Sequence, residues 1–491
     1  MGQNNKIPIK MITGSTMTFF VVGFLAMLTG VVFCNLDLSP HYILFLLGLS
    51  IAVILISFSQ FKYTPTISFH LQKFCCYLAF ICGFIGPALF PVGLGPFTLF
   101  PYRIFLLILL GLFTASSFIE GTIVLSMGRV KHYMIFFGFW LVYATFSLAW
   151  ALDKGDAMRQ LFFLFSGVLL LFFVTYYFHS LHDLNKLFWI WLGAFAALII
   201  LGCWEHLTGN HLPVSGYYGE LRPWIMYRPT GVFKNPNDFA TFLSLSIPFS
   251  LVLARYSGTI STKLAGIGTA FAAFYLIVAT GSRANILAVL LMVLFLLLFI
   301  VKLKQKVKVA VVLTVFLMLM VIFGLASPIQ EFAMRVAAEL SSLFDRGGGS
   351  VAVRFSLVRN GLVFLLSTGG LGVGAGNAEF WMAKFARHST SGILNPHNWW
   401  LEILVDYGVI VFCGYLVVYV GIVRTIWLAW RKAVDRKERM IAESLLLSLI
   451  GFSLASISSS SIMAFNPQWM LLAFAVAYLN YNGRPREEEI A

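Results

Sequence analysis

Apolar segments of about 20 residues follow one another along nearly the whole chain, separated by short polar connections. A segment of this length crosses the roughly 30 Å hydrocarbon core of a membrane as an α-helix, which satisfies its own backbone hydrogen bonds there. Charged residues are 11% of the 491 residues, less than half the roughly 25% typical of a soluble protein. The sequence therefore predicts an all-α, polytopic membrane protein with one domain over residues 1–491.

Fourteen segments fit such a helix. They cover residues 16–33, 41–59, 74–92, 101–119, 132–150, 160–178, 187–204, 237–254, 263–281, 284–301, 309–326, 398–423, 441–459 and 466–482. Glycines and prolines interrupt the third, and the ninth and tenth meet at Gly281-Ser282-Arg283, so we expect about 12 to 14 transmembrane helices. The first could be a signal peptide, but no convincing small-residue cleavage site follows it, and we expect it to be retained.

The distribution of lysine and arginine predicts the orientation. Basic residues concentrate in alternate connections, including residues 302–308 and 431–439, and such connections face the cytoplasm. Both termini are therefore predicted to be cytoplasmic, with extracytoplasmic loops at 205–236 and 327–397. The formal net charge of +14 follows largely from this topology, so no nucleic-acid partner is expected.

The large loop carries two amphipathic stretches, residues 329–344 and 353–366, with apolar side chains at three- and four-residue intervals. This spacing is typical of helices. Such helices lie either on the outer face of the bundle or packed between spans. The loop is therefore predicted to be helical.

Polar motifs stand at the predicted outer ends of the helices. Arg228-Pro-Thr-Gly and Asn235-Pro-Asn-Asp precede the eighth span. In the second motif, Asn237 or Asp238 is predicted to cap the next helix. Arg228 has no such structural role, because a guanidinium at a membrane boundary requires an anion or a carboxylate.

Two further arginines belong to this outer side. Arg283 follows Gly281-Ser282 between two closely spaced spans, where it either binds an anion or extends to the lipid headgroups. Arg354 lies in the second amphipathic stretch, where a solvated or headgroup-bound cation is the simpler interpretation.

The sequence Asn395-Pro-His397-Asn398 opens the twelfth span. His397 is the one side chain of these motifs with an ordinary pKa near neutrality, so it is the candidate proton acceptor, although isolated histidines are often structural. Glu402 and Asp406 are four residues apart and share a helix face. Either could orient the imidazole or neutralise an arginine.

Converging arginines suit pyrophosphate, because their planar donors match phosphate oxygens without requiring a metal. The sequence contains no metal-binding motif, no paired cysteine spacing and no Gly-rich ATP loop, so no metal or other cofactor is expected. The motifs suit displacement of a lipid-linked pyrophosphate from a sugar.

At these residues the chain resembles the O-antigen ligase and polymerase superfamily of bacterial envelope enzymes. The resemblance covers roughly residues 190–425. It rests on Arg228-Pro-Thr-Gly with Asn235-Pro-Asn-Asp, on Gly281-Ser-Arg283, and on the block from Arg354 through the glycine run 370–376 to Pro396-His-Asn398 and Glu402.

The resemblance implies that Arg228, Arg283 and, less directly, Arg354 hold the pyrophosphate of an undecaprenyl-linked glycan, while His397 is the base. Asn235, Asn237, Asn398 and Glu402 would support them. The glycine run is expected to form a tight turn bringing backbone near the substrate rather than a nucleotide loop.

Three functions remain open. A polymerase would join repeat units of a capsule, O-antigen or teichuronic acid type polymer in the bacterial cytoplasmic membrane, with a flippase and a chain-length regulator as possible partners. A ligase would move the glycan to lipid A core or protein. A transporter would place polar residues along a midplane path, whereas here they gather at one face.

Overall fold

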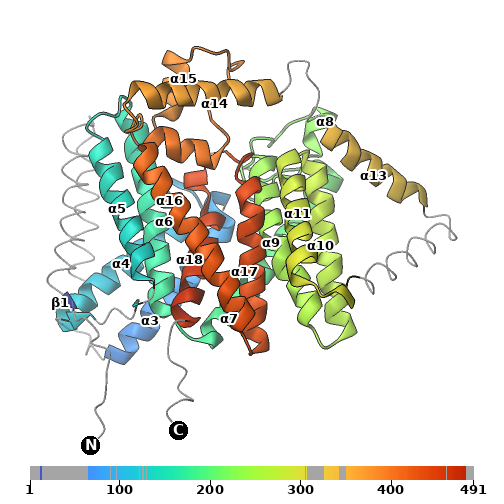
Figure 1. The fold of residues 1–491 in the computed structure, drawn as a ribbon, viewed down its shortest axis with the longest axis horizontal. Helices are drawn as coiled ribbons and strands as arrows, with labels where there is room; N and C mark the ends of the chain where they lie inside the picture. The colour runs from blue at the N-terminus through green and yellow to red at the C-terminus, as the bar shows by residue number, and fades with distance from the viewer. Residues whose placement is uncertain are drawn as a thin grey trace, which may run out of the picture. The chain divides into compact units, whose positions relative to one another are not determined.

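The computed structural model describes residues 12–13, 65–88, 90–94, 97–120, 122–123, 127–128, 130–304, 306, 326–341, 350–460 and 462–482. The predicted spans at 16–33 and 41–59, and all but the last residue of 309–326, lie outside the described residues. Each of the other predicted spans coincides with a helix. The described chain is almost entirely helical (Figure 1), which confirms the all-α class.

Eight helices of the described part are long and apolar enough to cross a membrane. The chain is therefore a multi-pass membrane protein by length and composition, while the total of 12 to 14 spans stays a prediction. The chain divides into two compact units, residues 1–184 with 466–491 and residues 185–465.

In its described part, the first unit contains six long helices or parts of helices and two short β-ladders. The elements are β1 (Ile12–Thr13), α3 (Pro65–Ile85), η1 (Gly86–Ala88), β2 (Val92–Leu94), β3 (Phe97–Leu99), α4 (Pro101–Glu120), β4 (Thr122–Ile123), α5 (Lys131–Ser147), α6 (Lys154–Tyr177), the start of α7 (Leu181–Thr208) and α18 (Asn466–Asn482). β1 pairs with β4, and β2 with β3, both antiparallel.

The helix α3 begins nine residues before the predicted span at 74–92 and ends seven residues earlier. Lys73, which the prediction placed just outside the span, lies inside the helix. Its ammonium group pairs with Asp183 at 2.8 Å, which compensates the charge. Gly86, with φ +57°, turns the chain at the C-terminal end, where only glycine adopts such a conformation without strain.

The second unit carries every motif singled out above. Its elements are most of α7, then α8 (Pro223–Met226), α9 (Pro236–Tyr256), α10 (Ile260–Thr280), α11 (Arg283–Phe295), the π-helical turn η2 (Leu296–Ile300), α13 (Ala326–Ser341), α14 (Ser350–Ser367), α15 (Ala378–Phe385), α16 (Trp399–Lys432), α17 (Arg436–Ala455) and η3 (Ile462–Ala464). In Figure 1, α14 runs crosswise to α17. The second amphipathic stretch is a helix, as predicted, and so is the first over its described residues 329–341.

The central helix of this unit is α9, which packs against α10, α11 and α17. Hydroxyl side chains between α9 and its neighbours satisfy backbone carbonyls: Ser250 of α9 donates to Gly266 of α10 at 2.7 Å, and Ser448 of α17 donates to Leu245 of α9 at 2.7 Å. Small polar residues let helices approach closely in an apolar environment. α9, α11 and α16 begin at the end of the unit where α17 finishes.

A kink divides α16 at Gly408, whose φ is +75° and ψ −176°. The glycine run packs directly into this kink, and the Val409 N–H donates to the Gly370 carbonyl at 2.9 Å. A Cβ on Gly408 would lie 2.3 Å from the Gly370 oxygen, and one on Gly372 would lie 2.5 Å from the Gly408 nitrogen. The run is the predicted tight turn, and its close approach is to the backbone of α16.

Replacing Gly408 by alanine is expected to destabilise the protein by about 2–6 kcal/mol, because backbone strain and a backbone clash add together. Gly369→Ala is the matched control: its φ is also positive, at +60°, but a Cβ there meets nothing within 4 Å. Thermal unfolding in detergent measures both. Equal melting temperatures for the two variants would contradict the packing described here.

Candidate functional site

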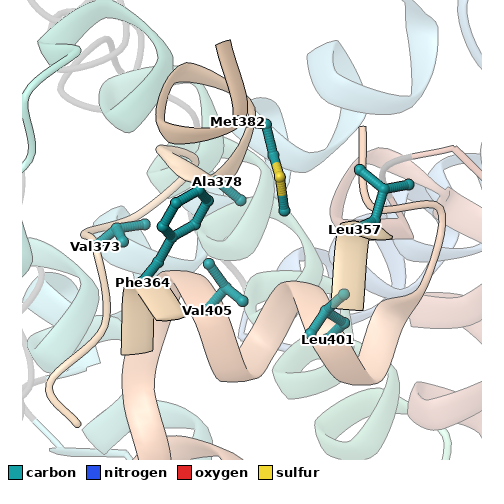
Figure 2. Close-up of a cluster of buried hydrophobic side chains, with 7 residues drawn as sticks. All are labelled: Leu357, Phe364, Val373, Ala378, Met382, Leu401 and Val405. Carbon is teal, nitrogen blue, oxygen red and sulfur yellow. The ribbon is translucent and has the colours of Figure 1, made fainter. Parts of the chain in front are cut away.

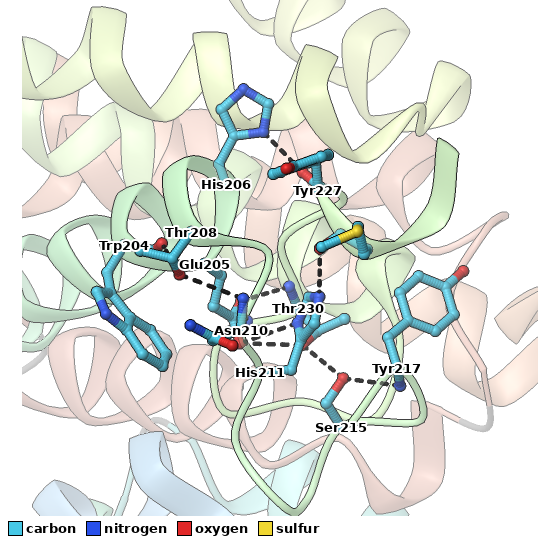
Figure 3. A network of polar contacts seen from close by, with 12 residues as sticks. Trp204, Glu205, His206, Thr208, Asn210, His211, Ser215, Tyr217, Tyr227 and Thr230 are labelled. Atoms are coloured by element: carbon cyan, nitrogen blue, oxygen red, sulfur yellow. Dashed lines mark hydrogen bonds and ion pairs between the residues drawn. The ribbon is translucent and has the colours of Figure 1, made fainter. Parts of the chain in front are cut away.

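A buried carboxylate holds the loop between α7 and α9. Glu205, fully buried near the end of α7, accepts hydrogen bonds from the backbone N–H groups of Thr230 at 2.7 Å and Gly231 at 2.6 Å. His211 Nδ1 lies 3.3 Å from the same carboxylate, and the Thr230 hydroxyl donates to Ser215 at 2.8 Å. Figure 3 shows these contacts converging on Thr230. The loop is therefore fixed from inside the protein.

Arg228 lies on this fixed loop and is exposed. Its backbone N–H donates to the Ile225 carbonyl at 2.9 Å, while its guanidinium makes no hydrogen bond or ion pair with any residue in the part of the chain that the structure describes. The cation is thus available to an anionic ligand. Sequence reasoning missed Glu205, although a lone acidic residue at the end of an apolar helix was a signal for it.

The Asn-Pro-Asn-Asp motif starts α9, but the prediction of its cap was wrong. The N-cap is Asn235, whose side chain accepts the Asp238 N–H at 2.9 Å. Pro236 then occupies the first helical turn, where its missing N–H has no cost, so Asn237 already lies inside the helix. Asn237 is half-buried, and its carbonyl accepts from Asn285 at 3.5 Å.

The connection between α10 and α11 is as short as predicted. Gly281, with φ +73°, ends α10, and Ser282 begins α11. Asn285 in the first turn is fully buried; its amide donates to Ser282 at 2.9 Å and accepts from Ser244 of α9 at 3.0 Å. Arg283 is half-buried at the start of this helix.

Residues 456–460, called here the serine segment, follow α17 and join the starts of α9 and α11. The Asn285 amide donates to Ser458 at 3.0 Å, and the Ser459 hydroxyl shares a hydrogen bond of 2.7 Å with Thr241 of α9. Ser460 donates through its backbone N–H and hydroxyl to Asp238, at 2.9 and 2.6 Å.

The serine segment also supports the start of α16, since the Ser456 carbonyl accepts from Trp399 at 3.0 Å. The sequence analysis did not single it out, although four serines among these five residues after an apolar stretch were a visible signal.

The helix α14 is anchored by an apolar cluster over the first half of α16 (Figure 2). The cluster consists of buried residues from α14, the glycine run, α15 and α16: Leu357, Phe364, Val373, Ala378, Met382, Leu401 and Val405. Gly361 permits the close contact, because a Cβ there would lie 2.9 Å from Val405.

Arg354 lies one turn before Leu357, on the side of α14 that packs, and is half-buried. Burial, followed by the positive charge of Arg283, lowers the pKa of the Arg354 guanidinium below its ordinary value. The interpretation of Arg354 as a solvated cation is therefore wrong, because the helical period turns it toward the protein. Arg359, on the opposite side of the same helix, is the exposed cation.

His397 precedes α16 with φ +48°, a conformation that is uncommon for a residue other than glycine. Its backbone N–H donates to Asn395 at 2.8 Å, and its Nδ1 lies 3.3 Å from the Ser459 carbonyl. Burial first, and then the charge of Arg354, lower the pKa of His397, while the Ser459 contact and Glu379 oppose that shift. The neutral imidazole is therefore favoured.

Asn398 caps α16, accepting from Trp400 at 3.1 Å and Leu401 at 3.4 Å. Asp406 does not orient His397: its buried carboxylate accepts from the Ala378 N–H at 2.8 Å and so anchors the start of α15, just after the glycine run. Glu402 is buried one turn below Asn398, whose carbonyl accepts its backbone N–H at 2.8 Å.

The predicted residues thus fall into two groups. Arg283, Arg354 and His397 act on one another electrostatically in sequence, Arg283 on Arg354 and Arg354 on His397. Arg228 lies on its own braced loop before α9. The N-termini of α9, α11 and α16 are joined through the serine segment, and helix N-termini favour negative charge. The arrangement can bind an anion beside a neutral imidazole.

Comparison with known proteins bears on the family of this chain. A family model described as O-antigen ligase matches residues 268–416, which include Arg283, Arg354 and His397. The Teichuronic acid biosynthesis protein TuaE of Bacillus subtilis (strain 168) is 30% identical over 430 residues, which cover 84% of this chain and 85% of that protein. The resemblance read from the motifs is confirmed: the chain belongs to the O-antigen ligase and polymerase superfamily of envelope polysaccharide enzymes.

Proposed function

We propose that this protein polymerises a cell-surface polysaccharide at the outer face of the bacterial cytoplasmic membrane. An acceptor sugar hydroxyl attacks the anomeric carbon of an undecaprenyl-pyrophosphate-linked glycan. The new glycosidic C–O bond forms as the bond between that carbon and the pyrophosphate oxygen breaks. The bonding electron pair leaves with undecaprenyl pyrophosphate, and the hydroxyl proton passes to His397.

The observation that carries this proposal is that two guanidinium groups, Arg283 at the start of α11 and Arg354 on α14, are half-buried and near enough to interact electrostatically. A dianion bound between two half-buried cations is attracted to both. Guanidinium groups also present paired donors that match phosphate oxygens. We assign the pyrophosphate to Arg283 and Arg354, with Arg228 approaching from its own loop.

His397 is the general base of the proposed reaction. The Ser459 carbonyl can only accept, so its contact with Nδ1 requires the proton on Nδ1 and leaves Nε2 as the basic nitrogen. Nε2 makes no hydrogen bond with another residue in the described part of the chain. A basic nitrogen without a protein partner is suited to accept the hydroxyl proton.

The relative described above supports the proposed substrate class. TuaE is named for teichuronic acid biosynthesis, and we propose that this chain likewise builds an envelope glycan from repeat units delivered by a flippase. A chain-length regulator is a further proposed partner. Ligation to another acceptor uses the same chemistry, so the product distinguishes the two.

The decisive experiment uses the purified full-length protein in detergent. Lipid-linked repeat units extracted from a host strain lacking this gene are incubated with it in buffer containing EDTA. A ladder of lengthened products is expected. One transferred chain on added lipid A core would indicate a ligase, and no new glycosidic bond would contradict the proposal. Activity lost in EDTA and restored by Mg²⁺ would contradict the proposed metal independence.

The proposal also requires the site to face outward. Cysteine at Ser389, exposed after α15, is expected to react with an impermeant maleimide in intact cells, or in spheroplasts if there is an outer membrane. Cysteine at Ser261, exposed at the start of α10, is the control and should react only after lysis. A background in which the exposed Cys413 is alanine removes that native signal. The reverse labelling pattern would contradict the topology and the site with it.

A further inference from the structure

One peptide group connects a buried carboxylate to the candidate base. The carbonyl of Ser459 and the N–H of Ser460 belong to the same planar peptide unit. The carbonyl lies 3.3 Å from His397 Nδ1, and the N–H donates to Asp238 Oδ1 at 2.9 Å. In a trans peptide these two groups point in opposite directions, so the peptide bridges the imidazole and the carboxylate.

Asp238 is not needed to cap its own helix, because Asn235 performs that role. Its carboxylate is buried and accepts three hydrogen bonds: from the Ser460 N–H, from the Ser460 hydroxyl at 2.6 Å and from the Asn235 amide at 2.8 Å. It also lies in the first turn of α9, where the helix dipole favours an anion. The carboxylate is thus held on the serine segment.

We propose that Asp238 is the positioning residue for His397, acting through the Ser459–Ser460 peptide. A carboxylate that accepts the peptide N–H polarises that peptide, and the polarised carbonyl becomes a stronger acceptor for the Nδ1 proton. This fixes the imidazole with Nε2 free to act as base and raises its basicity. The inference deepens the proposed function and rests on His397 as the base.

Other charged groups also face His397. Arg354 of α14 lowers the pKa of His397, and Glu379 of α15, which accepts from Asn395 at 2.6 Å, raises it. Arg283 of α11 acts on Arg354, and Glu402 lies on α16 itself. We propose that Asp238, like Glu379, raises the pKa of His397. Removal of the Asp238 charge should therefore lower the pKa of His397.

The test is Asp238→Asn in the full-length protein. The amide oxygen still accepts the Ser460 N–H, but the charge is lost. The expected result is a kcat/KM about 10- to 100-fold lower with the lipid-linked repeat units. The acid limb of the pH–rate profile, where activity declines as the pH falls, should also move to lower pH. Asp435→Asn is the matched control. Asp435 caps the N-terminus of α17, accepting from Lys437 and Glu438, whereas the serine segment follows the C-terminus of that helix.

A double variant guards against misfolding. Asn235→Asp with Asp238→Asn keeps the net charge, keeps a good N-cap at 235 and keeps an acceptor at 238, but moves the carboxylate away from the Ser460 N–H. The double variant is expected to show the same lowered rate and the same shift of the acid limb. If either the single or the double variant folds and its activity declines at the same acid pH as the wild type, Asp238 has only a structural role.

Titration of ¹⁵N-labelled histidine by NMR separates this inference from the proposed function, because it needs no substrate. The His397 signal is identified by its loss in His397→Asn. The proton is expected on Nδ1, with a pKa that falls in Asp238→Asn and not in Asp435→Asn. An Nε2–H tautomer, or an unchanged pKa, would overturn the inference. Failure of the wild-type protein to make polymer would overturn only the proposed function.

Discussion

His397→Asn is expected to lower kcat by about 10²- to 10⁴-fold, the range typical of a positioned general base. Asparagine keeps a hydrogen-bonding side chain near Ser459 but has no basic nitrogen at neutral pH. The control is His388→Asn, because His388 is exposed on the preceding loop and contacts Asn360 only through its backbone. Initial rates with lipid-linked repeat units measure both variants.

The pH profile gives a second test of this role. Since burial and Arg354 lower the pKa of His397, wild-type activity should persist as the pH falls through the ordinary histidine pKa of about 6.5. It should decline only at lower pH, where Nε2 becomes protonated. Near-normal activity of His397→Asn would make histidine a positioning residue and leave the reaction to the arginines and the leaving group.

Arg354→Lys is expected to lower kcat/KM about 10- to 100-fold. Lysine retains the charge but loses the planar pair of donors, and a hydrogen bond to a charged group contributes about 1.5–3 kcal/mol. Arg359→Lys on the exposed side of α14 is the control and should remain near wild type. Equal effects of the two substitutions would indicate a general role for positive charge on this helix.

Arg354→Gln separates charge from geometry, because it removes the cation that lowers the pKa of His397. Protonation of the imidazole then becomes easier, so the acid limb should move to higher pH, whereas in Arg354→Lys it should remain in place. Arg283→Lys is expected to lose activity for the same geometric reason as Arg354→Lys. An unmoved acid limb in Arg354→Gln would place Arg354 too far from His397 for the proposed site.

Much of the architecture could be predicted from the sequence because the membrane imposes one conformation on long apolar segments. Every predicted span within the described residues is a helix. Arg283 and His397 were identified for a related reason: polar residues at the ends of apolar helices have few structural roles. The helix boundaries were predicted less accurately, as α3 shows. Hydropathy places Lys73 outside the span, but its ion pair with Asp183 allows the lysine to lie within the helix.

Local sequence did not predict which residues support the site. Asn237 or Asp238 was expected to be the cap, but Pro236 places that role on Asn235. Arg354 was interpreted as solvated, although the packing of Leu357 and Gly361 against α16 turns it inward. Asp406 was a candidate partner of His397 and instead anchors the start of α15. The last two outcomes depend on which face of a helix meets a neighbour, whereas the cap follows from the position of Pro236.

The sequence by itself determined the helical membrane class, the superfamily motifs and the chemical identity of the candidate base and cations. Only the tertiary structure decided that Glu205 holds the Arg228 loop, that the serine segment joins α9, α11 and α16, and that Asp238 reaches His397 through a peptide group. Asp238 and Ser460 are 222 residues apart in the chain. A contact at that separation arises from helix packing, so neither segment by itself indicates which residue it will pair with.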